Sequence, residues 1–235
     1  MGMSLVSNQA KRHPRKGGDP SVLLAFLQPK WIPAFAGMAM LLVFLLLSNA
    51  VYADTPPVIE SPQLQKCLKR ADEFPDIAAA EAAVWIKKNG GDEAHLCRAF
   101  AQANRGMHED AAREFWALAS TYEKQNLNRA LLMHNFAGQE FLIAKDIKNA
   151  DAQYAAVLKI APNDATGLIG RAKTRMEAER YWEAIDDLNR VLKVNPDDID
   201  ALRQRGRAWT HLDNANNAQE DFARAGQLAG DQTGK

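Results

Sequence analysis

The sequence has no excess of either charge, since its 29 lysines and arginines match its 29 aspartates and glutamates. Residues 1–53 differ in composition from the rest and hold five basic residues and one acidic residue. Without them the balance is 24 basic against 28 acidic residues, a net charge of −4. Nucleic-acid binding relies on a basic surface that neutralises phosphates. A nucleic-acid partner is therefore not expected.

The sequence also lacks the short motifs that catalytic sites use. His108-Glu109 begins like a zinc-protease motif, but the second histidine would fall at position 112, which is an alanine. There is no Gly-x-Ser-x-Gly, and Gly167–Gly170 is not followed by the Lys-Ser or Lys-Thr of a phosphate-binding loop. The remaining histidines without metal-ligand spacing are His95, His134 and His211. We therefore expect no metal, no cofactor and no enzymatic activity in this chain.

Nor does any stretch alternate polar and apolar residues as strands do. Small residues instead recur every 34 positions, in the sets Ala150, Ala184, Ala218 and Gly138, Ala172, Gly206. Large residues follow the three alanines four positions later: Tyr154, Leu188 and Phe222. The same interval separates Pro162 from Pro196. Residues at i and i+4 share a helix face and proline ends helices, so the pattern predicts helices that close on one another through small side chains.

A 34-residue unit of this kind resembles the tetratricopeptide repeat (TPR), a helix-turn-helix pair. The resemblance implies an all-α fold, a right-handed alpha-alpha superhelix of about five helix pairs. Units 131–164, 165–198 and 199 onward share the pattern, and a degenerate first pair is expected at 63–73 and 75–88. The interval from Ala111 to Ala150 is 39 residues, which predicts an inserted helical turn or a longer loop near 122–129.

Four positions depart from the TPR pattern. Arg175 and Gln102 stand where a packed aromatic residue is usual, and His95 and His134 stand where a large apolar residue is usual. The small residue of the second helix and its large partner nevertheless persist in four units. We therefore expect divergent local packing within an intact repeat.

Residues 1–53 have the features of a bacterial leader segment. No charge occurs from Trp31 through Ala53, and Met38–Leu47 is a compact apolar run. Val51-Tyr52-Ala53 offers small residues where signal peptidase reads them, which predicts cleavage after Ala53 and a periplasmic location. An uncleaved inner-membrane anchor is the alternative, because the uncharged stretch is long enough to span a bilayer.

The predicted division of the chain is a leader (1–53), a linker (54–60), a repeat domain (61–228) and a flexible tail (229–235). Residues 13–38 resemble a palindromic intergenic repeat that is often mistranslated in bacterial genomes. Translation from Met38 or Met40 is therefore an alternative, in which residues 1–37 are not translated.

The two cysteines, Cys67 and Cys97, fall in the first helices of two successive predicted pairs. Export favours a disulfide between them, and two buried thiols are the alternative. In strict repeat register the two sites differ by about one turn, so side-chain geometry leaves both outcomes open. A bond would stabilise the degenerate first pair by about 3 kcal/mol.

The TPR resemblance also implies a binding groove. In that family the second, fifth, ninth and twelfth positions of the first helices line the concave face. Eight residues at these positions are interpreted as peptide-binding: Asn135, Gln139, Leu142, Ile169, Lys173, Met176, Arg203 and Arg207. The amides are expected to bond a peptide backbone, the two arginines a carboxylate, and the apolar side chains an anchor. A solvated helix face without a ligand is the alternative.

These features together predict a non-catalytic scaffold or adaptor of the bacterial cell envelope that binds a peptide or helix of another protein. Two alternatives stay open: a structural or self-assembling repeat protein, and an accessory module of an envelope enzyme complex. The expected partner is a protein that the sequence does not identify. Contact with a membrane is expected only through an uncleaved leader.

Overall fold

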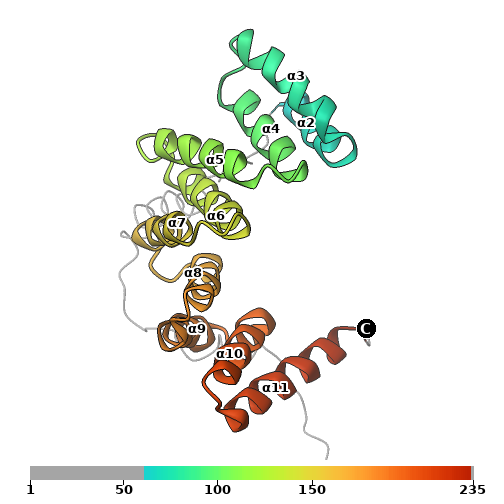
Figure 1. Cartoon of the computed structure of the whole chain (residues 1–235). Helices are drawn as coiled ribbons and strands as arrows, with labels where there is room; N and C mark the ends of the chain where they lie inside the picture. The colour runs from blue at the N-terminus through green and yellow to red at the C-terminus, as the bar shows by residue number, and fades with distance from the viewer. Residues whose placement is uncertain (1–60, 234–235) are drawn as a thin grey trace, which may run out of the picture. The chain divides into compact units, whose positions relative to one another are not determined.

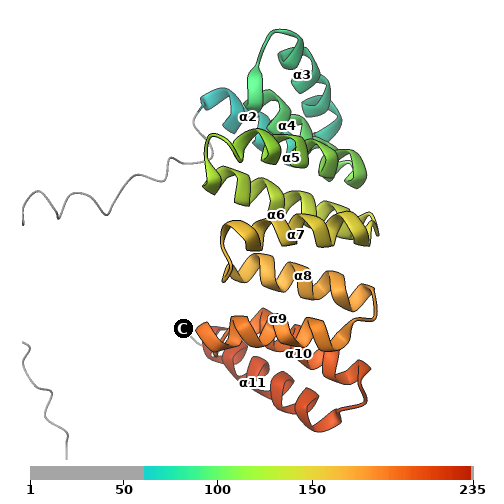
Figure 2. The same cartoon turned by 90° about the vertical axis from the view of Figure 1, so that its left-hand side faces the viewer.

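The structure, a computed structural model, describes residues 61–233. The predicted leader (1–53) and linker (54–60) lie outside these residues. The helices of this part of the chain are α2 (Pro62–Glu73), α3 (Pro75–Lys87), α4 (Gly91–Asn104), α5 (His108–Tyr122), α6 (Leu127–Ile143), α7 (Ile147–Ile160), α8 (Ala165–Glu177), α9 (Tyr181–Val194), α10 (Ile199–His211) and α11 (Ala215–Thr233). Residues 61–233 contain no strand, and successive helices stack on one another (Figures 1 and 2). The predicted all-α architecture of about five helix pairs is confirmed.

The 34-residue period comes from the lengths of the helices and turns. The unit that starts at α7 has a 14-residue helix, the turn 161–164, the 13-residue α8 and the turn 178–180. The unit that starts at α9 has the same helix lengths. In the unit that starts at α5, however, α5 has 15 residues and α6 has 17. The longer upstream interval is therefore absorbed by extra helix, mostly in α6, and not by a longer loop.

The helices at the start of the repeat domain match the predicted ranges, and the last helix runs beyond the predicted end of the domain. The first pair occupies Pro62–Glu73 and Pro75–Lys87, as the degenerate pattern predicts. The last helix, α11, runs to Thr233 and so includes the first part of the predicted tail (229–235). Residues 234–235 lie outside the described part of the chain.

Two recurring turns close the helix pairs. Four of the first helices begin at a side chain that accepts a hydrogen bond from the backbone N–H three residues on: Ser61, Asn126, Asp164 and Asp198. At the other turn a residue with positive φ ends the first helix: Gly106, Lys145, Glu179 and Asp213. Such a residue lets the chain leave a helix while its last carbonyl groups stay bonded. The same caps thus recur with the repeat.

The predicted small residues do face the core. The ring of Tyr154 in α7 lies against Gly138 of α6 and Gly170 of α8, where a Cβ atom on either glycine would overlap it. Tyr154 is only 4% exposed, and Ala150 and Ala184 are fully buried. Burial, together with the nearby charge of Glu140, raises the pKa of the Tyr154 hydroxyl. Close helix contact through small side chains is therefore a property of the fold.

Three of the four departures from the TPR pattern, Arg175, His134 and His95, make polar contacts across a helix pair. Arg175 of α8 donates to Asp187 of α9 at 2.7 Å. His134 of α6 lies at hydrogen-bond distance from Gln153 of α7, 2.8 Å, and from Glu123, 3.0 Å. Buried polar groups need such partners, so hydrogen bonds here replace the usual apolar packing.

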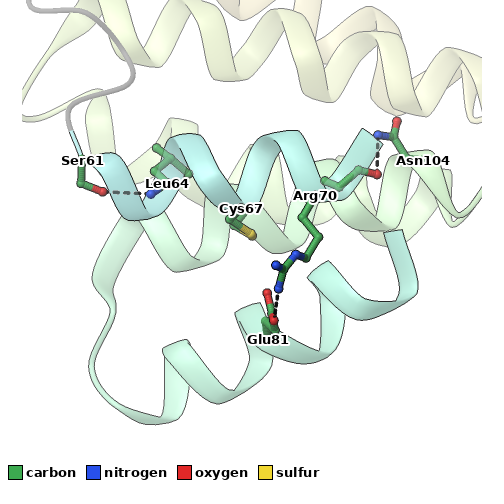
Figure 3. The surroundings of a disulfide bond; sticks show 8 residues. Ser61, Leu64, Cys67, Arg70, Glu81 and Asn104 are labelled. Atoms are coloured by element: carbon green, nitrogen blue, oxygen red, sulfur yellow. Dashed lines mark hydrogen bonds and ion pairs between the residues drawn. A yellow bond between two sulfur atoms is a disulfide. The ribbon is translucent and has the colours of Figure 1, made fainter. Parts of the chain in front are cut away.

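The first two pairs are joined by a disulfide between Cys67 of α2 and Cys97 of α4, whose Cα atoms are 6.0 Å apart (Figure 3). Both cysteines are buried. Nearby, Arg70 of α2 pairs with Glu81 of α3, and Asn104 of α4 donates to a backbone carbonyl oxygen of α2 at 3.0 Å. The structure therefore links α2 to its neighbours by a covalent bond and by polar contacts.

Candidate functional site

An open cavity of about 580 Å³ lies along the first helices of the last three pairs. Its lining consists of Leu142 from α6, Lys173, Met176 and Glu177 from α8, Glu179 from the following turn, Tyr181 from α9, and Gln204, Arg207 and His211 from α10. Its volume falls in the range of ligand-binding pockets, and its lining is more polar than is usual for small-molecule sites.

Four of the eight predicted peptide-binding residues line this cavity: Leu142, Lys173, Met176 and Arg207. Leu142 and Met176 are half-buried apolar side chains from adjacent first helices. Lys173 and Arg207 supply positive charge from α8 and α10. The repeat positions thus bring residues from three helices to one cavity, and their role as peptide ligands stays a prediction.

The other four lie elsewhere. Asn135 is only 9% exposed, and its side-chain amide donates to the Asp164 carboxylate at 3.5 Å. Ile169, also 9% exposed, belongs to the buried cluster that extends from α7 to α11. Gln139 and Arg203 are exposed but do not line the cavity. Asn135 therefore lies near the cap of the next first helix, and Ile169 packs in the core.

Five lining residues were not among the predicted ones: Glu177, Glu179, Tyr181, Gln204 and His211. Glu177 and His211 are 34 residues apart and occupy the last position of their helices, so the repeat itself points to them. Tyr181 and Glu179 reach the cavity because the turn between α8 and α9 folds back at Glu179, whose φ is 58°. The repeat positions of the first helices do not indicate that residues in this turn, or at the start of the next helix, line the cavity.

Charges in and beside the cavity are only partly paired. Asp200 accepts from Lys173 Nζ and from Gln204 Nε2, both at 2.8 Å. Burial alone would raise the pKa of Asp200, but these two hydrogen bonds and the charges of Lys173 and Arg207 lower it below its ordinary value. This carboxylate therefore stabilises the fold above its ordinary pKa, and the contribution is lost as the pH falls through the lowered one.

Aromatic stacking fixes one end of the cavity. The rings of Tyr181 and His211 lie 4.6 Å apart with an angle of 6° between their planes. Because Tyr181 begins α9 and His211 ends α10, the stack ties these two helices together beside the cavity. The cavity wall is therefore held in place at this end.

The cavity offers charge, hydrogen bonds and apolar contact, which suit binding. Within residues 61–233, no three His, Cys, Asp or Glu side chains gather as a metal site would require. No helix in that same part of the chain combines the length and the apolar character needed to cross a bilayer.

The fold is TPR-like, and solved structures share it. MamA from Desulfovibrio magneticus RS-1, from residue 41 to its end, gives a TM-score of 0.61 at 21% identity, covering 72% of this chain and 92% of that one. A crystal structure of MamA gives a TM-score of 0.59 at 14% identity, covering 75% of this chain and 100% of that one. At such identities the likeness shows the fold alone.

Sequence comparison adds a short match. Human protein unc-45 homolog B is 31% identical over 94 residues, which are 39% of this chain and 10% of the human protein. The chain thus spans only 10% of the length of this curated relative. No family model matches the chain. These similarities show a TPR-like fold and do not identify a function.

Proposed function

We propose that this protein is a non-catalytic scaffold or adaptor of the bacterial cell envelope, and that its cavity takes a peptide segment or helix of a partner protein. The observation that carries the proposal is the cavity of about 580 Å³ in which Leu142, Lys173, Met176 and Arg207 meet. These residues come from three successive first helices, which form the extended binding surface of helical repeat proteins.

The lining supports peptide binding because it offers two kinds of contact. Leu142 and Met176 present apolar surface for an anchoring side chain, and a thioether adapts to several shapes. Arg207 presents donors for carboxylates or backbone carbonyl oxygens, and the Lys173 ammonium has further donors besides the one given to Asp200. A peptide segment supplies both partners in one ligand.

The proposal is tested with a photo-cross-linking side chain in place of Met176, and with the same side chain in place of Lys159 as a control. Lys159 is exposed on α7 and does not line the cavity. After irradiation with an envelope fraction, we expect protein adducts from position 176 and none from position 159. Equal labelling at both positions would remove the cavity from the proposal.

The envelope location rests on residues 1–53 and remains a proposal. The disulfide between Cys67 and Cys97 supports it, because disulfides persist in oxidising compartments such as the periplasm. Mass spectrometry of the protein from its native host tests the processing: an N-terminus at Asp54 is expected for a cleaved leader. A mass that retains residues 38–53 would support the membrane-anchored alternative.

Self-assembly is a second candidate function, favoured by one observation at α11. Phe222 is 41% exposed and borders an open hollow of about 700 Å³, whereas its counterparts Tyr154 and Leu188 are buried. Tyr154 is covered by α8, and no helix within residues 61–233 covers Phe222 in the same way. Sedimentation at increasing protein concentration tests whether a second copy covers this face.

A further inference from the structure

Most arginines within the described part of the chain, residues 61–233, are paired with carboxylates. Ten arginines between Arg70 and Arg224 form ion pairs. Arg203 and Arg207 of α10 form none within residues 61–233. Both are exposed, and Arg207 lines the cavity. The described chain places no carboxylate at ion-pair distance from these two neighbouring arginines, which points to acids supplied by a ligand.

The surroundings of the two arginines explain why they stay unpaired. They are one helical turn apart, so their side chains share a face of α10 with Cβ atoms about 5–6 Å apart. Asp200, the acid of α10, is already held by Lys173 and Gln204, and Arg207 acts on it only as a more distant charge. Arg207 itself reaches only Gln204, at 3.4 Å. Like charges at this spacing repel each other, so folding alone gives no reason for the pair.

We propose that the segment bound in the cavity is acidic: one of its carboxylates pairs with Arg207 in the cavity, a second pairs with Arg203 beside it, and a neighbouring apolar side chain packs against Leu142 and Met176. The inference rests on the proposed peptide-binding function and names the chemistry of its ligand. Guanidinium groups bind carboxylates in a bidentate manner that lysine does not match. The two arginines fit acids at i and i+4 of a helix or at i and i+2 of an extended chain.

Negative charge at the end of the cavity limits where these acids lie. Glu179 has no ion pair within residues 61–233, and Glu177 is neutralised by Lys145 at 2.7 Å. A ligand acid beside Glu179 would be repelled, since both charges would be only partly screened there. The two carboxylates are therefore placed over α10, away from the turn 178–180.

Selection from a displayed library of short random peptides tests the inference without a known partner. The unaltered protein is expected to enrich peptides that carry two Asp or Glu residues beside an apolar residue. The enrichment in acids should be lost with R203A/R207A. It should persist with K159A/K193A, which removes the same charge from exposed positions on α7 and α9.

The outcomes of the selection are distinct. Enrichment of apolar peptides without acids would overturn the acidic ligand and leave the peptide-binding function in place. Failure to enrich any peptide would overturn both. The spacing of the enriched acids, four residues or two, shows whether the ligand binds as a helix or as an extended chain.

A charge reversal separates direct contact from an indirect effect on the fold. Fluorescence anisotropy with a selected acidic peptide should give a Kd about tenfold higher for R203A/R207A, and an unchanged Kd for K159A/K193A.

The charge-reversed variant R203E/R207E should not bind this peptide, and it should bind a version of the peptide with Lys in place of the two acids. Unaltered helix content in the circular dichroism spectrum verifies the fold, and equal binding of both peptides by both proteins would overturn the inference.

Discussion

At the scale of single residues, a polar link recurs across the helix pairs. An arginine of the first helix binds an acid of the second, 16 positions later, in three pairs: Arg98 with Glu114, Arg171 with Asp187, and Arg205 with Asp221. In the pair α6/α7, His134 and Gln153 make the corresponding contact. The acids are largely buried, so each link combines charge with hydrogen bonds in a low-dielectric setting.

Asp187→Asn should be strongly destabilising. Asp187 is buried and accepts from Arg171 at 2.7 and 2.8 Å and from Arg175 at 2.7 Å. Loss of its charge leaves two largely buried guanidinium groups without a counter-ion, and breaking a buried ion pair costs about 3–5 kcal/mol. Chemical denaturation measures the change in the free energy of unfolding. The control is Asp186→Asn at the adjacent exposed position, and equal effects of both changes would contradict the assignment.

Ala184→Leu tests the close contact of α8 and α9. Ala184 is fully buried, so a larger side chain forces its neighbours apart. Overpacking of this kind costs about 1–3 kcal/mol, and a lower melting temperature is expected. Ala155→Leu, at an exposed position of α7, serves as the control. An unchanged melting temperature of the Ala184 variant would show that the contact tolerates bulk.

At the scale of elements, the sequence predicts the helix pairs correctly wherever the spacing of the small core residues and the turn residues indicate the same helix ends. Pro162 and Pro196 lie in the turns before α8 and α10, and Asp198 caps α10 as its turn position suggests. The longer interval upstream was ambiguous because an extra turn and a longer loop add the same number of residues. The side chain of Asn126 decides it: the amide oxygen accepts from the Arg129 N–H and starts α6 early.

The cavity was predictable only in part, for a physical reason. A repeat position fixes the direction in which a side chain leaves its helix, which correctly brings Lys173 and Met176 together. It does not say which neighbours cover that side chain, and Ile169 is covered by the core. Tyr181 comes from the following second helix, and its approach depends on the backbone of a turn. A prediction of groove residues from positions in the first helices alone therefore leaves out Tyr181.

Reduction of the disulfide should loosen the first pair selectively. The bond closes a sequence separation of 30 residues, and its loss is expected to cost about 3 kcal/mol. Hydrogen exchange with and without a reductant should show faster exchange in α2 and α3, and unchanged exchange in α8 to α10. Cys67→Ser provides the same test without a reductant. Uniform acceleration across all helices would instead show that the chain opens as one unit.

At the scale of the whole described chain, stability is distributed along a stack. The main helix contacts join each helix to its immediate neighbours, with additional contacts between successive first helices (Figure 2). Repeat proteins of this kind gain stability from the repeats and from their nearest-neighbour interfaces. A helix face that lacks a neighbour therefore lacks one interface, which is the situation of Phe222 on α11.

If a second copy covers that face, Ala223→Glu should reduce self-association. Ala223 is exposed and borders the hollow beside Phe222, so a carboxylate there would be desolvated in any interface. Ala155→Glu is the matched control, because Ala155 follows Tyr154 on α7 as Ala223 follows Phe222 on α11. Sedimentation velocity over a range of concentrations should show association for the unaltered protein and the control, and a smaller species for Ala223→Glu. A single monomeric species for all three proteins would reject self-assembly through α11 and leave the cavity as the candidate interaction site.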